Sequence, residues 1–217
     1  MTTTAASHPD QPIKLYRMNI SGHAHRVELF LSLLGLPFEL INIDLTTGTH
    51  KKPEFLALNP FGQLPVIQDG DITLADSNAI LVYLATRYAA PSASWLPKDA
   101  LGAAHVQRWL SVAAGLLAFG PAAARVIQLF KRPDNPEVPI ARAHALFSVM
   151  EQQLGQSMFL VGNAPTLADI ANYSYIARAP EGNVSLVAYP NLRAWLARIE
   201  ALPGFVPMVS SPVGLAA

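Results

Sequence analysis

The first part of the chain combines two strand-like patterns with one helical period. Residues 13–18 alternate loosely between apolar and polar side chains, which predicts a strand. After Ser21-Gly22, apolar side chains recur at the spacing of one helix face, at Val27, Phe30, Leu31 and Leu34. Gly35 supplies a helix stop, and residues 38–45 again have a strand pattern. These segments together predict a βαβ unit.

A β-hairpin and a second helix are predicted next. An Asp69-Gly70-Asp71 turn is flanked by the apolar residues Val66, Ile67, Ile72 and Leu74. Pro65 stands where the first of these strands should start, although a proline donates no hydrogen bond to a sheet. Asp76-Ser77 then starts a helix whose apolar face holds Ile80, Leu81, Leu84 and Tyr88. The order βαβ-ββα predicts a small mixed sheet with helices packed on it, an α/β domain.

The rest of the chain has only helical patterns. A segment rich in Pro, Ser and Ala follows residue 88 and is typical of a linker. Beyond it, helices separated by Gly and Pro are predicted at 101–119, 122–131, 140–154, 166–179 and 192–202. We therefore predict a tail at 1–12, an α/β domain at 13–88, a linker at 89–100, an all-helical domain at 101–205 and a tail at 206–217.

Composition restricts the possible partners and the location. The chain is 51% hydrophobic, only 14% charged and has a formal net charge of +0, so no electrostatic reason favours nucleic acid or an anionic membrane as a partner. The apolar run 110–130 approaches the length of a membrane span, but Gly120-Pro121 breaks it and Arg125 interrupts it, which predicts a pair of buried helices. The N-terminus has neither the basic region nor the apolar core of a signal peptide, so we predict a cytoplasmic protein.

The chain contains no cysteine. This excludes disulfides, thiolate metal sites, iron–sulfur clusters and every mechanism that uses a cysteine nucleophile. Any sulfur chemistry must therefore come from a bound ligand.

Short motifs in both domains resemble one known family. The stretch 59–66, NPFGQLPV, resembles the N-P-x-G-x-V-P signature of the cytosolic glutathione S-transferases, and 76–80, DSNAI, resembles their E-S-x-A-I element. Residues 166–169, TLAD, resemble the buried capping box of that family, and Pro190-Asn191-Leu192 with Trp195 resembles its C-terminal P-x-L-x-x-W. The resemblance covers residues 13–205 and implies a thioredoxin-like N-terminal domain followed by an all-helical domain.

The resemblance implies a purpose for Pro65. In this family the proline is cis, and the residue before it, here Leu64, pairs through its backbone with the cysteinyl unit of glutathione. Gln63 can donate to and accept from the same peptide. Without the neighbouring motifs, Pro65 would read as a proline at a sheet edge or bulge.

The ionic groups of glutathione require further partners. The helix that begins at Asp76-Ser77 offers free N–H groups and a positive dipole end to a carboxylate, although both residues also suit simple N-capping. Asp76 replaces the glutamate that is usual in the family and is one methylene shorter. His50 and Lys51 resemble the loop that holds the glycyl carboxylate in serine-type members, whereas a lone charged run of this kind is usually solvated surface.

The thiol of glutathione needs a hydrogen-bond donor that stabilises its thiolate. Ser21 is the catalytic candidate, because the motif that starts there resembles the serine-centred motif of bacterial, theta- and phi-like members. A plain N-cap serine is the structural alternative. His23, which we also place in the glutathione site, and Asn19 lie close to the same helix start and are further candidate donors, whereas Tyr16 is expected to face the other side of the sheet.

We therefore predict a glutathione S-transferase that conjugates glutathione to small apolar electrophiles or reduces hydroperoxides. Glutathione is the co-substrate, no metal is required, and the resemblance implies a homodimer. A non-catalytic carrier of apolar ligands, or an interaction module, is the alternative from another class, and a glutathione-dependent isomerase or dehalogenase is a third. The capping box and Trp195 are expected to be structural. The large apolar residues available in 101–131 include Trp109, Leu116, Phe119, Ile127 and Phe130, and most of them should form core.

Overall fold

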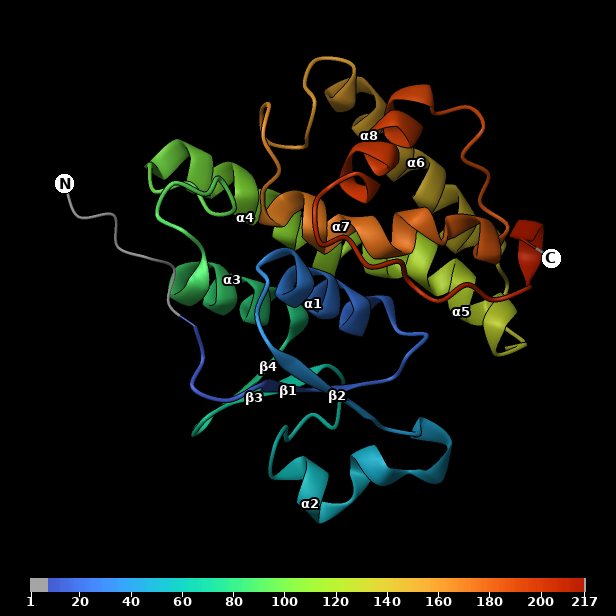
Figure 1. Cartoon of the computed structure of the whole chain (residues 1–217). Helices are drawn as coiled ribbons and strands as arrows, with labels where there is room; N and C mark the ends of the chain where they lie inside the picture. Colours follow the sequence, from blue (N-terminus) through green and yellow to red (C-terminus); the bar gives the residue numbers. More distant parts are fainter. Residues whose placement is uncertain (1–7, 217) are drawn as a thin grey trace. The chain divides into compact units, whose positions relative to one another are not determined.

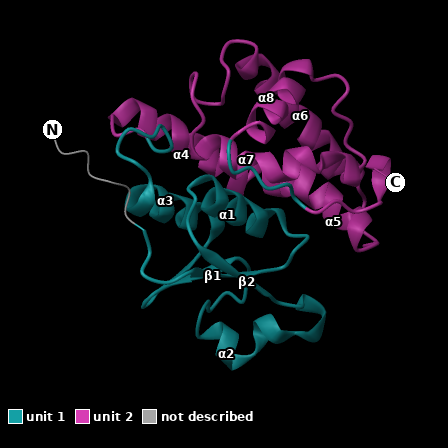
Figure 2. Ribbon diagram, in the orientation of Figure 1, with its two compact units in different colours: residues 1–96, 203–208 teal, residues 97–202, 209–217 magenta. Residues whose placement is uncertain are grey.

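The computed structural model describes residues 8–216 of the chain and divides it into two compact units. The first unit runs to Leu96 and also takes in Pro203–Met208, and the second contains Pro97–Leu202 and the residues from Val209 onward (Figure 2). The part of the predicted N-terminal tail before residue 8 lies outside the described residues.

The first unit is built on a four-stranded mixed sheet in the order β2-β1-β3-β4. Its strands are β1 (Ile13–Arg17), β2 (Phe38–Asn42), β3 (Val66–Asp69) and β4 (Ile72–Ala75). β1 is parallel to β2 and antiparallel to β3, and β3 forms the predicted hairpin with β4. The mixed sheet predicted from the βαβ-ββα order is therefore confirmed.

Helices cover both faces of this sheet. α1 (Gly22–Leu33) and α3 (Ser77–Tyr88) lie on one face, and the short α2 (Pro53–Leu56) lies on the other (Figure 1). Val27, Phe30 and Leu31 of α1 and all four predicted apolar positions of α3 are buried together with Ile13 and Leu15 of β1, whereas Leu34, the C-cap of α1, is only half-buried. Tyr16 takes the opposite side, where its ring packs edge-on against Phe55 of α2 with 6.4 Å between ring centroids. The side-chain alternation along β1 thus separates Tyr16 from α1, as its position in the strand implied.

The connection after β2 differs from the prediction. The strand ends at Asn42 and not at residue 45, because the Asp44 carboxylate accepts hydrogen bonds from the Thr46 N–H and hydroxyl at 2.8 and 2.6 Å. This local bonding starts a 3₁₀ turn, Leu45–Thr47, which a second turn, Thr49–Lys51, follows. The pattern of polar residues gave no signal for these turns or for α2.

The segment Pro203–Met208 returns to the first unit. The Ser32 hydroxyl of α1 donates to the Gly204 carbonyl at 2.6 Å, and the His25 ring lies 2.9 Å from the Val206 carbonyl. Residues 203–205, which the helical pattern placed at the end of the all-helical domain, are therefore held by α1.

The second unit is a bundle of helices. Its helices are α4 (Ala100–Ala114), α5 (Ala123–Leu129), α6 (Glu137–Leu154), α7 (Leu167–Ala177) and α8 (Pro190–Glu200), with a π turn at Ala118–Ala122 and 3₁₀ turns at Ala179–Gly182 and Gly214–Ala216. α7 is the central helix, because its residues from Leu167 to Ile176 are all buried. The five helical segments predicted from the sequence correspond to these five helices.

The apolar run at the start of this unit forms two helices of the bundle. Ala100–Leu129 is long and apolar enough to cross a membrane by length and composition alone, and 44% of its most apolar window is buried inside the protein. Gly120 takes a non-helical conformation and, with Pro121, breaks the run. A Cβ at Gly120 would lie 3.1 Å from the backbone nitrogen of Ala143, so the absence of a side chain permits this close contact with α6.

The buried carboxylate of Asp169 organises the start of α7. Its Oδ2 accepts from the Thr166 N–H at 2.8 Å, and its Oδ1 accepts from the Leu160 N–H at 2.9 Å and from the Trp195 indole at 2.8 Å. Thr166 and Asp169 form the reciprocal capping box that the sequence predicted. Trp195 is fully buried, so its predicted place in the core is also confirmed.

We expect Asp169→Ala to lower the free energy of unfolding by about 3–5 kcal/mol, because three buried donors lose their acceptor at a cost of about 1–3 kcal/mol each. Urea unfolding measures the change. Asp134→Ala is the matched control, because that carboxylate is half exposed in its ion pair with Arg132. Equal small changes in both variants would contradict the structural importance of Asp169.

Candidate active site

The sheet register gathers the predicted site residues at one edge of the first unit. Val66, the first residue of β3, is opposite Tyr16 near the end of β1 and opposite Ala75 at the end of β4. The chain therefore leaves β1 toward Ser21, enters β3 through Leu64-Pro65 and leaves β4 toward Asp76-Ser77 at the same edge of the sheet. Three segments that are distant in sequence thus meet at one place.

Ser21 is the N-cap of α1. Its backbone is extended and its Oγ accepts a hydrogen bond from the Ala24 N–H at 3.3 Å. The side chain is half-buried, and no acidic residue stands in the first turn of this 12-residue helix. Because Oγ is an acceptor here, its own proton remains available as a donor at the positive end of the helix. The N-cap and donor interpretations of Ser21 are therefore compatible.

The two other candidate donors differ from each other. Asn19 is exposed in the turn between β1 and α1. Burial, together with the positive charge of Arg26, lowers the pKa of His23 to about 3, so its imidazole is neutral near pH 7. A neutral imidazole can still donate one hydrogen bond, but it brings no positive charge to the start of α1.

Asp76 and Ser77 form the start of α3. The backbone of Asp76 has a positive φ of 70°, and its Oδ1 caps the helix by accepting from the Asn78 and Ala79 N–H groups, each at 2.9 Å. The capping therefore uses two of the free N–H groups of the helix. Ser77 is 5% exposed, and its N–H has no hydrogen-bond partner among residues 8–216.

The buried side chain of Arg26 forms a hydrogen bond to Ser77. It is 1% exposed in α1, and its Nη1 donates to the Ser77 Oγ at 3.2 Å and to the Asn78 Oδ1 at 2.9 Å. Arg26 was not among the site residues predicted from the sequence. The available signal was an arginine five residues after Ser21, directly before the apolar position Val27.

The Leu64-Pro65 segment presents backbone groups. The Leu64–Pro65 peptide is cis, Pro65 is buried, and Leu64 is half-buried. Within the described chain, no hydrogen bond reaches the N–H or the C=O of Leu64. Asn59 is 3% exposed and braces the loop, because its amide donates to the Gln63 carbonyl at 2.9 Å and accepts from the Phe61 N–H at 3.1 Å. Gln63 itself is exposed.

His50 and Lys51 lie beside this loop. The Lys51 amino group donates to the carbonyls of Phe61 and Gly62 at 3.3 and 3.4 Å. His50 is half-buried, and its Nδ1 is buried without a hydrogen-bond partner. Gly62 allows the approach: it has a φ of 59°, and a Cβ there would lie 2.7 Å from the His50 carbonyl oxygen. The predicted cation therefore stands next to the predicted backbone-docking loop.

The described residues contain no group of three or more His, Cys, Asp or Glu side chains that could hold a metal ion. The groups that converge at the sheet edge are helix N-termini, hydroxyls, unpaired backbone groups and a lysine. Such a set suits an extended, anionic peptide.

Comparison with known proteins decides the family. The model of the N-terminal domain of glutathione S-transferases matches residues 11–86, and the model of their C-terminal domain matches residues 108–203. The chain belongs to the glutathione S-transferase family. It is 39% identical to glutathione S-transferase 3 of Zea mays over 214 residues, which cover 92% of this chain and 94% of the relative.

Solved glutathione S-transferases share the fold. A glutathione S-transferase from Pseudomonas fluorescens has a TM-score of 0.86 and 34% identity, with 92% of this chain and all of that chain covered. A glutathione transferase homologue from Drosophila mojavensis, solved with bound glutathione, has a TM-score of 0.80 and 29% identity over 88% of this chain and 89% of its own. The thioredoxin-like domain, the transferase class and glutathione as co-substrate are thereby established for this chain.

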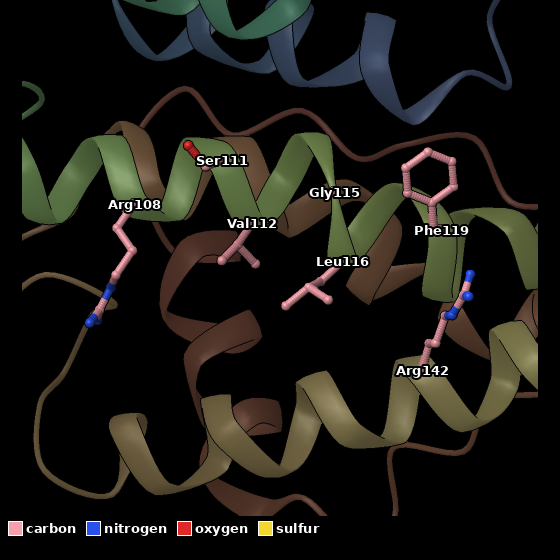
Figure 3. A pocket seen from close by; sticks show the side chains of 7 residues that line it. All are labelled: Arg108, Ser111, Val112, Gly115, Leu116, Phe119 and Arg142. Atoms are coloured by element: carbon pink, nitrogen blue, oxygen red, sulfur yellow. The ribbon is translucent and has the colours of Figure 1, made fainter.

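In this transferase, the large apolar residues of the helical unit do not lie mainly in the core. This differs from the expectation drawn from the sequence. Trp109 is 3% exposed, but Leu116, Phe119 and Phe130 are 55%, 62% and 50% exposed. The helical period marks an apolar face, and it cannot tell whether the same chain covers that face. Val112 and Leu116 point toward α6 and, with Arg108 and Arg142, line a hollow of about 610 Å³ (Figure 3). We call these four residues, with the hollow they line, the α4–α6 groove.

The depressed pKa of His23 predicts a pH dependence of the stability of this transferase. The unfolded chain binds a proton at His23 below its ordinary pKa of about 6.5, whereas the folded chain does not until about pH 3, so the stability falls as the pH falls through 6.5. Between about pH 7.5 and about pH 5.5 this accounts for at most about 1.4 kcal/mol.

Urea unfolding of wild type and His23→Gln at both pH values measures this contribution. We expect the wild type to lose more of its free energy of unfolding on acidification than the variant does. Equal losses in the two proteins would show that the folded state protonates His23 as readily as the unfolded state.

Proposed function

We propose that the protein binds glutathione at the β1–β3–β4 edge of the sheet and that the Ser21 hydroxyl stabilises its thiolate for attack on small apolar electrophiles. The observation that carries this proposal is the geometry of Ser21. Its Oγ accepts from the Ala24 N–H, so its own proton can be donated to a bound ligand. A thiolate there would also lie at the positive end of α1.

Ionisation of the thiol is the step that the protein would promote. A free thiol with a pKa of about 8.5 is mostly protonated at neutral pH, and a hydrogen bond to the anion lowers that value. The thiol proton leaves to solvent, and the thiolate then forms a bond to an electrophilic carbon while the leaving group, or an electron-accepting group, takes the electron pair. With a hydroperoxide, attack on oxygen breaks the O–O bond and gives an alcohol and the sulfenic acid of glutathione, which a second glutathione converts to the disulfide.

The remaining groups would hold the tripeptide. The unpaired N–H and C=O of Leu64 match the backbone of the cysteinyl unit. The N–H and hydroxyl of Ser77 match the γ-glutamyl carboxylate, and Lys51 with the unpartnered His50 Nδ1 matches the glycyl carboxylate. Gln63, Pro65 and Asp76 complete the proposed site, with Asp76 in a reduced role because one of its carboxylate oxygens caps α3.

The engagement of Asp76 also favours the second candidate function, a carrier that binds glutathione or apolar ligands without turnover. A carrier would bind glutathione with an unshifted thiol pKa, whereas the transferase lowers it. Absorbance of the bound thiolate measured against pH therefore separates the two candidates.

We further propose a cytoplasmic homodimer in which two copies pack through the α4–α6 groove. Leu116, Phe119 and Val149 expose large apolar surfaces on α6 and on the segment after α4. A second copy related by a two-fold axis would bury these surfaces and would place Arg108 and Arg142 at the rim.

We expect Ser21→Ala to lower kcat by about ten- to a thousandfold with the KM for glutathione nearly unchanged, because the hydroxyl acts on the thiolate and not on the rest of the tripeptide. The pKa of the bound thiol should rise toward its free value. Steady-state kinetics with an aryl halide and thiolate absorbance measure both effects. Tyr16→Phe is the matched control: its hydroxyl donates to Gln68 on the other side of the sheet, so it should retain wild-type kcat.

We expect Leu116→Glu to convert the protein to a monomer at micromolar concentration, because it places charges at the centre of the proposed interface. Light scattering after size-exclusion chromatography gives the mass. Val187→Glu is the control, because Val187 is 77% exposed and lies outside the groove. A wild-type protein that is itself monomeric would refute the dimer.

A further inference from the structure

Arg26 is a buried guanidinium in a part of α1 that otherwise faces core. It is 1% exposed, and its neighbours Ala24, Val27 and Phe30 are fully buried. Burial of a charge is costly unless hydrogen bonds compensate it. Two of its bonds reach the first turn of α3, at the Ser77 Oγ and the Asn78 Oδ1. The side chain thus joins the start of the helix that carries Ser21 to the start of the helix that carries Ser77.

The direction of the bond to Ser77 has a chemical consequence. A guanidinium can only donate, so the Ser77 Oγ must be the acceptor. Arg26 is the only partner of that oxygen within the described chain, so the hydroxyl proton is not committed to another residue there. The bond from Arg26 therefore leaves the Ser77 hydroxyl to act as a hydrogen-bond donor toward another group.

Ser77 provides the hydrogen-bond donors that remain available at the start of α3. Asp76 already uses the N–H groups of Asn78 and Ala79, which an anion would otherwise bind. The N–H of Ser77 and its hydroxyl are left as a pair of donors on one residue. A carboxylate can accept from both at once only if the hydroxyl points outward.

The positive charge of Arg26 also affects the pKa of a residue at the start of α1. After burial, it is the second cause of the lowered pKa of His23, which lies two residues after Ser21. A positive charge that disfavours a protonated imidazole there would favour a thiolate in the same place.

We propose that Arg26 is a positioning residue for glutathione, which fixes the Ser77 hydroxyl as a donor to the γ-glutamyl carboxylate and supplies a buried positive charge to the starts of α1 and α3. This inference rests on the glutathione site proposed above. Arg26 does not contact the ligand in this proposal. It acts through the orientation of the Ser77 hydroxyl and through the electrostatic field of its guanidinium charge.

Two substitutions separate the geometry of Arg26 from its charge. Arg26→Met retains an unbranched apolar stem, and Arg26→Lys retains the charge but not the planar fork that reaches both acceptors. For Arg26→Met we expect the KM for glutathione to rise about ten- to a hundredfold, because the contact of Ser77 with the carboxylate is weakened equally in the ground and transition states. With kcat measured about one pH unit above the free-thiol pKa of about 8.5, where the bound thiol is ionised in both proteins, we expect it to change less than about threefold. The pKa of the bound thiol should rise as well. Arg26→Lys should raise KM about tenfold and leave that pKa close to the wild-type value.

A double-mutant cycle with Ser77→Ala tests the route of action. If Arg26 acts through Ser77, the double variant Arg26→Met/Ser77→Ala binds glutathione no more weakly than the weaker single variant. Thermal unfolding checks that each variant is folded, and if Arg26→Met does not fold, the cycle uses Arg26→Lys. Wild-type KM in a folded Arg26→Met, or in a folded Arg26→Lys when that variant alone is available, overturns the proposal. Fully multiplicative effects in the cycle also overturn it. Failure of the wild type to bind glutathione would instead refute the proposed function itself.

Discussion

The arrangement of the site depends on the strand pairing of Val66 with Tyr16 of β1 on one side and with Ala75 of β4 on the other. β3 lies between β1 and β4, and the start of β3 is in register with the ends of both neighbours. A slip of one residue would exchange the two faces of the strand and would separate Leu64 from Asp76. Val66 and Ile67 are fully buried, so the packing on both faces resists such a slip. The hydrophobic core thus determines where three remote segments of the proposed ligand site meet.

Helix termini supply most of the polarity of that edge. α1 and α3 each have 12 residues, and neither has an acidic residue in its first turn. His23 contributes no charge, because burial keeps it neutral, whereas Arg26 keeps its guanidinium close to both helix starts. Lys51 stands at the other side of the docking loop. The proposed binding mode would therefore place the two carboxylates and the thiolate of the tripeptide close to two helix N-termini and two positively charged side chains.

The sequence predicted the features that have a strong period or a local hydrogen-bonding signature. The hairpin at residues 66–75, the buried faces of α1 and α3 and the capping box at Asp169 belong to this group, since neighbouring residues alone specify each of them. The 3₁₀ turns after β2 were missed, because the bonds from Thr46 to Asp44 override the strand propensity of Ile43 and Leu45.

Features that depend on tertiary context were less predictable. Most of the large apolar residues of 101–131 were expected in the core, but Leu116 and Phe119 are exposed, because a helical period identifies an apolar face without identifying what covers it. For Arg26 the error was the opposite, because a charged residue expected at the surface is buried. Charged residues are rarely buried, so an arginine within α1 was not considered as part of the site. The motifs placed Ser77 in the predicted site, but only the packing of α1 against α3 revealed that Arg26 donates to its hydroxyl oxygen. The shorter Asp76 strengthens this dependence, because its carboxylate turns back onto the Asn78 and Ala79 amides, which in the proposed site would leave carboxylate recognition to Ser77.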